Sequence, residues 1–181
     1  PDYETKSSYS AEVIASDGTN ATARTLSITV INLNDNIPTF TSASTFTVAE
    51  NQTDGPTVEA SDNDGDTLTY SISGGTDASS FSIDSSSGAL TFVTSPDYET
   101  KSSYALTVSA SDGENITDQS VTVNIGNLNE HAPSLSLNSP YSVNEGSTTV
   151  TTITATDADG DETITFSIFD TGNSCTDNDL F

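Results

Sequence analysis

The sequence predicts an all-β protein made of tandem seven-stranded Greek-key β-sandwiches, with one complete domain flanked by two partial ones. Three observations support this fold class. Apolar and polar residues alternate with a period of two along most of the chain, and no stretch has the apolar stripe of an amphipathic helix. Gly, Asn, Asp and Ser separate the alternating runs, as they do between short strands. Residues 1–9 recur letter for letter as residues 96–104, so the repeated unit has 95 residues, about the size of one sandwich domain.

The complete unit contains several runs rich in β-branched and aromatic residues, which are typical of strands. In order, the expected strands are Thr45–Val48, Thr57–Ala60, Thr67–Ser73, Phe81–Asp84, Ala89–Thr94, Tyr104–Ser109 and Ser120–Ile125. The alternation predicts a core formed by Tyr70, Ile72, Phe81, Ile83, Leu90, Phe92, Leu106, Val108, Val121, Val123 and Ile125. The same alternation predicts that the intervening side chains face water, namely Thr69, Ser71, Ser82, Thr91, Thr107 and Thr122.

The repeat also predicts the domain limits. Pro38 and Pro133 follow equivalent linker runs, and proline there halts strand pairing. We expect residues 1–37 to be the C-terminal half of a domain, residues 38–133 a complete domain, and residues 134–181 the N-terminal half of a third. The linkers are short and contain no Gly/Ser tract, so a further interaction must fix the angle between neighbouring domains.

The charge balance excludes several classes of partner. The chain has 27 Asp and Glu against 3 Lys and Arg, for a formal net charge of −24. Repulsion from phosphates argues against nucleic acid, and an anionic membrane surface is disfavoured for the same reason. Only 32% of the residues are hydrophobic, but their regular alternation argues against global disorder.

Acidic residues gather in four clusters that recur at the 95-residue period. They are Asp-Tyr-Glu (Asp2 and Glu4; Asp97 and Glu99), Asp-x-Asp-Gly-Asp (Asp62, Asp64 and Asp66; Asp157, Asp159 and Asp161), the linker runs 32–36 and 127–131, and Ala-Ser-Asp-Gly (Asp17; Asp112). The spacing of Asp-Tyr-Glu predicts two carboxylates on one side of an extended segment. Any one Asp-Gly step could be only a turn former. Four clusters recurring together favour a cation site, and oxygen donors with almost no His or Cys select calcium.

These motifs resemble cadherin repeats. That family has a Glu early in its first strand, an Asp-Arg-Glu segment, an Asp-x-Asn-Asp-Asn-x-Pro linker, an Asp-x-Asp pair and a late Ala-x-Asp-Gly. The counterparts here are Val48-Ala-Glu-Asn51, Asp97-Tyr-Glu99, Asn32-Leu-Asn-Asp-Asn-Ile-Pro38, Asp62-Asn-Asp64 and Ala110-Ser-Asp-Gly113. The resemblance covers the whole chain. The Tyr within Asp-Tyr-Glu and the richness in Ser and Thr favour a microbial or other non-metazoan surface protein.

The resemblance implies Ca²⁺ at each junction between successive domains. At the first junction it implies the ligands Asp2, Glu4, Asn34, Asp35, Asp62, Asp64 and Asp112, with the backbone carbonyls of Leu33 and Asn36. At the second it implies Glu50, Asp97, Glu99, Asn129, Glu130, Asp157 and Asp159, with the carbonyls of Leu128 and His131. Glu145 and Asp17 would serve other junctions. Three features depart from the family pattern: Asn32 and Asn127 replace Asp, Glu130 replaces Asp, and His131 replaces Asn.

From these features we expect a calcium-rigidified extracellular repeat segment of a cell-surface adhesin or stalk protein, whose partners are neighbouring domains of the same array. Homophilic or self-assembly contacts are a further possibility. Two alternatives stay open, a structural subunit of an extracellular filament and a polysaccharide-binding module. Catalysis is not expected, because His131 is the single histidine and lies in a linker.

Three remaining features concern a possible disulfide, glycosylation and the two partial repeats. Cys175 is the single cysteine, so a disulfide partner would lie outside residues 1–181. The sequons at Asn20, Asn51 and Asn115 would carry glycans only in a source that glycosylates proteins. Residues 1–37 and 134–181 hold complementary halves of a repeat, so they either continue into a longer chain or complete one another between molecules.

Overall fold

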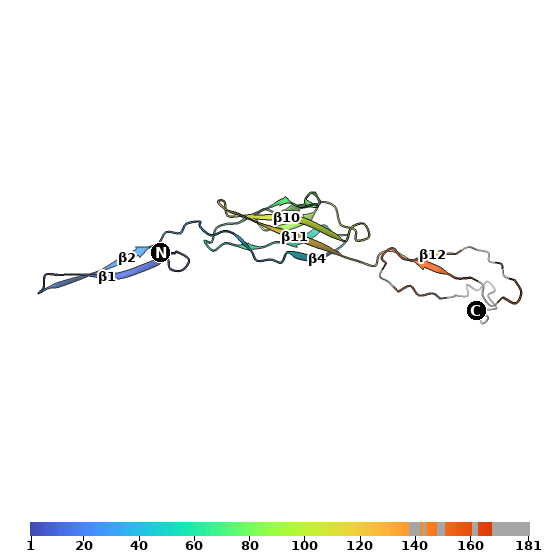
Figure 1. Ribbon diagram of the computed structural model, residues 1–181, viewed down its shortest axis with the longest axis horizontal. Coiled ribbons are helices and arrows are strands. Elements are labelled where there is room, and N and C mark those ends of the chain that lie inside the picture. Colours follow the sequence, from blue (N-terminus) through green and yellow to red (C-terminus); the bar gives the residue numbers. More distant parts are fainter. Residues whose placement is uncertain (138–141, 143, 148–150, 161–162, 168–181) are drawn as a thin grey trace. The chain divides into compact units, whose positions relative to one another are not determined.

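The computed structural model describes residues 1–137, 142, 144–147, 151–160 and 163–167, and these residues are almost entirely strands and connecting loops (Figure 1). The chain divides into two compact units, residues 1–126 and residues 127–181, and each is described by itself. Cys175 and Asp161 lie outside the described residues. The fold class expected from the alternation is confirmed.

The first unit begins with an antiparallel hairpin. Strand β1 (Ser8–Ser16) pairs with β2 (Ala21–Thr29) in continuous register from Ser8↔Thr29 to Ser16↔Ala21. The turn between them is held by Asp17, whose Oδ1 accepts hydrogen bonds from the N–H groups of Thr19 at 2.9 Å and Asn20 at 2.7 Å. Asp side chains favour such turns because they satisfy backbone donors locally.

A four-stranded sheet follows, with the strand order β4-β11-β10-β7. It consists of β4 (Thr45–Ala49), β7 (Thr69–Gly74), β10 (Ser103–Ser111) and β11 (Ile116–Gly126). The pairs β7–β10 and β10–β11 are antiparallel, whereas β4 lies parallel to β11. Figure 1 shows the long strands β10 and β11 side by side in this sheet.

The remaining strands of the complete domain form two smaller sheets. One has the order β5-β9-β8, from β5 (Asp54–Thr57), β9 (Ala89–Phe92) and β8 (Phe81–Ile83), and a 3-10 turn at Ala78–Ser80 precedes β8. The other pairs β3 (Thr39–Phe40) with β6 (Ala60–Ser61).

One expected strand differs in the structure. The continuous strand predicted at Thr57–Ala60 is wrong, because the chain there passes from pairing with β9 to pairing with β3 and divides into β5 and β6. The two residues between them bond to loops: the Val58 N–H donates to the Gly88 carbonyl, and the Glu59 carbonyl accepts from the N–H of Thr41. Strand β3 was not predicted.

The core lies between the sheets and contains the predicted residues together with Val58 and Ala110, which were not predicted. Its buried members are Val58, Tyr70, Phe81, Leu90, Phe92, Leu106, Val108, Ala110, Val121, Val123 and Ile125, with Ile72 and Ile83 partly buried beside them. Phe81, Phe92 and Tyr104 form an aromatic cluster with ring centroids 4.4–5.7 Å apart. Gly88 is required in the connecting turn, because its φ is +71° and a Cβ there would meet the Val58 carbonyl oxygen at 2.2 Å.

In the second unit, β12 (Ser134–Ser136) pairs antiparallel with β13 (Thr154–Thr156). The loop that follows β13 carries Asp157 and Asp159, and the segment before β12 is the linker run 127–131. The short β12–β13 pair therefore sets these two acidic segments of the second unit at one end of a ladder.

Candidate metal centre

The two Asp-Tyr-Glu segments form turns, so the prediction that they are extended is wrong. The Lys6 N–H donates to the Asp2 carbonyl and the Lys101 N–H to the Asp97 carbonyl, each at 2.9 Å, which closes one helical turn. The Asp side chain then accepts from the residue three positions later: Thr5 Oγ1 lies 2.7 Å from Asp2 Oδ2, and Thr100 Oγ1 lies 2.8 Å from Asp97 Oδ2. Local side-chain bonding of Asp competes with the extended form here.

These hydrogen bonds lower the pKa of both aspartates. The first cause at Asp2 is the side-chain bond from Thr5, and at Asp97 it is the side-chain bond from Thr100. The carboxylates of Asp2 and Asp97 are thus held in the turn. Glu4 meets other acidic segments in the first copy, and both Asp97 and Glu99 do so in the second.

Asp64 is the centre around which the first linker folds. Its Oδ2 accepts hydrogen bonds from the N–H groups of Asp35 at 3.0 Å and Asn36 at 2.7 Å, and its Oδ1 accepts from Asn36 Nδ2 at 2.8 Å. Its backbone carbonyl accepts from Asn32 Nδ2 at 2.8 Å. The linker run 32–36 is therefore wrapped around one residue, Asp64, which lies 28–32 positions further along the chain.

Carboxylates from three separate segments converge beside Asp64. Oxygen atoms of Glu4, Asp35 and Asp64 all lie within 4.8 Å of one another, and so do those of Asp62, Asp64 and Asp66. Gly65 makes the tight Asp62–Asp66 turn possible with a φ of +82°. Glu4 and Asp35 also line a hollow of about 610 Å³ beside the linker.

Desolvation and mutual repulsion both affect the ionisation of this group. A hydrogen bond from its own N–H lowers the pKa of Glu4, but desolvation, Asp2 and the charge of Asp64 outweigh it, and the net pKa is raised. Desolvation raises the pKa of Asp66, and the charges of Asp62, Asp64 and Asp112 add to this effect. At Asp64, desolvation is the largest single effect and raises the pKa, but the hydrogen bonds involving Asn36, Glu4 and Asp35 together outweigh it, so the net pKa is lowered.

The residues of the first linker fit a hard divalent cation. The three basic residues of the first unit lie elsewhere: Lys6 is over the Tyr9 ring at 4.7 Å, Lys101 forms an ion pair with Asp77, and Arg24 is in strand β2 opposite Val13. Oδ2 of Asp62 is buried and has no hydrogen-bond partner among the described residues. A cation would supply both the missing positive charge and the missing contact, and carboxylate and carbonyl oxygens are the donor set that Ca²⁺ prefers.

The predicted ligands Asn34 and Asp112 meet through a residue that the sequence analysis did not select. Asn115 Nδ2 donates to Asn34 Oδ1 at 3.2 Å, to the Asn36 carbonyl at 3.4 Å and to Asp112 Oδ2 at 3.2 Å. No local pattern marks Asn115 for this role, because two of its acceptors lie 79 and 81 positions away. A search for donors at the 95-residue period could have found it, because Asn20 occupies the equivalent position.

A second acidic group lies at the other end of the complete domain. Oxygen atoms of Glu50, Asp97 and Glu99 lie within 4.8 Å of one another. Glu50 is 2% exposed, and its Oε2 accepts the Tyr98 N–H at 2.7 Å. The predicted ligands of the second junction that belong to the first unit are therefore brought together.

The other predicted ligands of the second junction lie in the second unit and repeat the first linker. Asp159 Oδ2 accepts from the N–H groups of Glu130 at 3.1 Å and His131 at 2.9 Å, and the Asp159 carbonyl accepts from Asn127 Nδ2 at 2.8 Å. Asp157 Oδ1 accepts the Asp159 N–H at 3.1 Å, and Asn129 and Asp157 line the same hollow.

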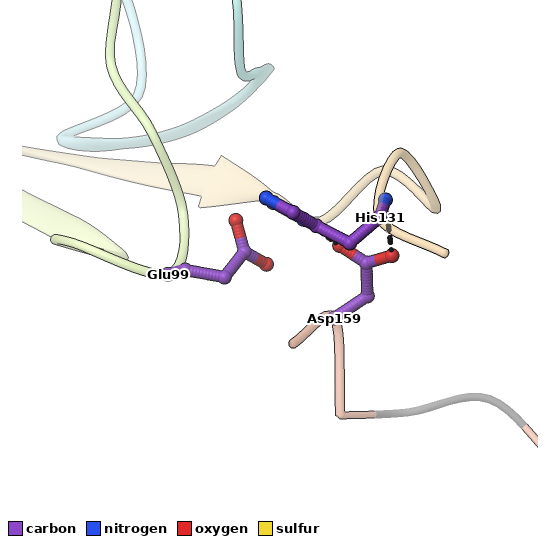
Figure 2. A group of neighbouring side chains, drawn as sticks. All are labelled: Glu99, His131 and Asp159. Carbon is purple, nitrogen blue, oxygen red and sulfur yellow. Dashed lines mark hydrogen bonds and ion pairs between the residues drawn. The ribbon is translucent and has the colours of Figure 1, made fainter. Parts of the chain in front are cut away.

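His131 uses its side chain as well as its backbone. Its Nδ1 lies 2.8 Å from Asp159 Oδ1, the same distance as Asn36 Nδ2 from Asp64 Oδ1, and Figure 2 shows the imidazole and the carboxylate joined in this way. This bond is the first cause of the lowered pKa of Asp159. Histidine therefore replaces asparagine in this linker as a side-chain partner of the central aspartate.

Comparison with known proteins identifies the fold family. The sequence model of the cadherin domain family matches residues 44–126, which span β4 to β11. The chain carries cadherin-like repeat domains. Cadherin domains generally bind calcium.

Relatives and solved structures agree with this assignment. The chain is 38% identical over 177 residues to human cadherin EGF LAG seven-pass G-type receptor 2, covering 89% of this chain and 6% of that protein. It is 34% identical to human cadherin-23, covering 87% of this chain and 5% of that protein. Among solved structures, protocadherin gammaB7 EC3-6 in a cis-dimer superposes with a TM-score of 0.73 at 26% identity, covering 87% of this chain and 44% of that one. The chain thus spans a small part of the length of these relatives.

Proposed function

We propose that this segment binds Ca²⁺ at its domain junctions and is thereby stiffened as part of an extracellular, cell-surface adhesin or stalk. The observation that carries the proposal is the convergence of Glu4, Asp35 and Asp64 from three separate segments. Within the described residues, no helix has the length and hydrophobicity needed to cross a membrane.

The cation would supply the positive charge that joins carboxylates which otherwise repel one another. At the first junction the residues that would hold it are Glu4, Asp35, Asp62 and Asp64, together with Asn34, Asp112 and the backbone carbonyl of Asn36. Asp2 would contribute mainly by fixing the turn that presents Glu4. At the second junction the corresponding residues are Glu50, Asp97, Glu99, Asn129, Glu130, His131, Asp157 and Asp159.

The linker residues would link metal binding to stiffness. Asp35 lies in the linker, Glu4 precedes the β1–β2 hairpin, and Asp64 belongs to the complete domain, so a shared cation restrains all three segments. We propose on this basis that the domains divide at residues 37/38 and 133/134. The partners of each domain would be its neighbours in the array, and homophilic contact is a possible further role.

Small-angle scattering of the chain in millimolar Ca²⁺ and in EGTA tests this proposal. We expect a longer and narrower particle with calcium, because the acidic junctions then bind a cation in place of repelling one another. Mg²⁺ at the same concentration is the ionic control, since it prefers a smaller octahedral shell and retains its waters. Identical scattering profiles in calcium and EGTA would rule the proposal out.

A further inference from the structure

Asn115 lies at the centre of three oxygen atoms that the proposed function assigns to a cation. They are Asn34 Oδ1, the Asn36 carbonyl oxygen and Asp112 Oδ2, at 3.2, 3.4 and 3.2 Å from the Asn115 amide nitrogen. An amide NH₂ group has two hydrogens, so three acceptors share two donors. The same oxygens would be 2.3–2.6 Å from a bound Ca²⁺.

The position of Asn115 is fixed by its backbone. Its N–H donates to Asp112 Oδ1 at 2.6 Å, and its carbonyl accepts from Ser111 Oγ at 3.0 Å. Both bonds lie within the turn between β10 and β11, which belongs to the packed sheet of the complete domain. The amide group is therefore presented to the linker from a hydrogen-bonded turn of the sheet.

We propose that Asn115 is a positioning residue that substitutes for the cation, holding Asn34, Asn36 and Asp112 together when Ca²⁺ does not. This inference rests on the proposed calcium function. The partial positive charge of the amide hydrogens attracts these three oxygen atoms weakly, and a divalent ion would attract them strongly. Because the amide and the ion attract the same oxygens, the contribution of Asn115 to stability is largest without calcium and falls when calcium is bound.

The repeat provides a matched control for this proposal. Asn20 occupies the equivalent position in the first hairpin, where its Nδ2 donates to Asp17 Oδ2 at 3.4 Å within its own turn. Both positions are sequons, so substitution of either one removes the same modification motif. An effect at Asn115 that is absent at Asn20 would thus come from the linker oxygens.

Thermal unfolding of the chain in EGTA and in Ca²⁺ tests the proposal with Asn115→Asp, Asn115→Ser and Asn20→Asp. We expect both Asn115 variants to lower Tm in EGTA by roughly 4 °C, from the loss of shared hydrogen bonds. In calcium, Asn115→Asp keeps an oxygen near the ion and Asn115→Ser has no amide group to compete with it, so both stay within about 1 °C of the wild type. Asn20→Asp should leave Tm unchanged in both conditions.

An equal loss of Tm in EGTA and calcium, or no loss in either, would show that Asn115 is not a substitute for the cation. A larger loss in calcium would contradict the proposal as well. The wild-type chain separates this failure from that of the proposed function. If its own Tm does not rise with calcium, the calcium function fails; if it rises but the Asn115 variants behave like Asn20→Asp, only the role of Asn115 fails.

Discussion

The two copies of the repeat in this chain fold alike locally and differ in their surroundings. Residues 1–9 and 96–104 are identical, and both form the same turn with the same Asp–Thr bond. The hairpins that follow keep the same register, with Ser8↔Thr29 in one and Ser103↔Asn124 in the other. Every residue of β1 is exposed, whereas β10 carries buried residues. Turn and register are thus local properties, and burial depends on the strands that cover the hairpin.

The two linkers make equivalent hydrogen bonds with different side chains. Asp64 and Asp159 each accept two consecutive linker N–H groups and a side-chain nitrogen, although the latter comes from Asn36 in one and His131 in the other. The central aspartate therefore makes equivalent contacts in both linkers, and either asparagine or histidine supplies the side-chain nitrogen.

The largest effect on one linker is expected when its central aspartate is removed. Asp64→Ala eliminates three acceptor contacts to the linker and one carboxylate of the acidic group. We expect the calcium affinity of the first junction to fall by on the order of a hundredfold, because the substitution removes a ligand and also the hydrogen bonds that hold the linker in place. Calorimetric titration would measure it. Asp84→Ala is the control, because Asp84 bonds within its own turn to Ser86 and Ser87, and the prediction fails if the two variants bind calcium equally well.

The contrast in burial can be measured with one substitution made in both copies. Val13 and Val108 occupy the same position of the repeat, but Val13 is 53% exposed and Val108 is 0% exposed. We expect Val108→Ala to lower the free energy of unfolding by about 2 kcal/mol, through two lost methyl groups and the cavity they leave. Val13→Ala should change it by less than about 0.5 kcal/mol. Urea denaturation followed by circular dichroism measures both, and equal losses would show that β1 is covered as fully as β10.

The smallest expected effect concerns the shared turn. Thr5→Val and Thr100→Val each remove the hydroxyl that is the first cause of the lowered pKa of Asp2 and Asp97. A lowered carboxyl pKa stabilises the fold above the pKa of the unfolded chain, near 3.9, and the contribution is lost as the pH falls through the lower folded value. We expect each substitution to raise the pKa of its own aspartate and leave the other unchanged. Carboxyl NMR titration would detect this, and a shift at both sites from one substitution would contradict a local origin.

The sequence predicted most of the sandwich because alternation reports burial directly. Tyr70, Val108 and Val121 lie in the core as expected, since each occupies the inward position of a regular strand. The predictions failed where the backbone changes its hydrogen-bond partner or where a side chain takes the place of a partner strand. The stretch at Thr57–Ala60 changes partner strand, which alternation cannot register, and Asp-Tyr-Glu closes a turn because an Asp side chain can replace strand pairing.

The candidate site was predictable in its acidic residues and less so in its hydrogen bonds. Glu4, Asp35 and Asp64 were selected from recurring motifs and are brought together in the structure. Their role as ligands, like that of every other predicted ligand, stays a prediction. Asn115 and the ring of His131 could not be selected in the same way, because their role depends on neighbours that only the folded chain brings within reach.

The parallel pairing of β4 with β11 has a mechanical consequence. Strand β4 lies near the start of the complete domain and β11 near its end, and the two run in the same direction over five aligned residue pairs, from Thr45↔Thr122 to Ala49↔Gly126. Tension applied through the preceding and following linkers pulls these strands past each other along their length. Their hydrogen bonds are then loaded in shear and must break together, whereas a hairpin pulled open at one end unzips bond by bond. A domain with this strand order resists stretching at its two termini better than its small size suggests.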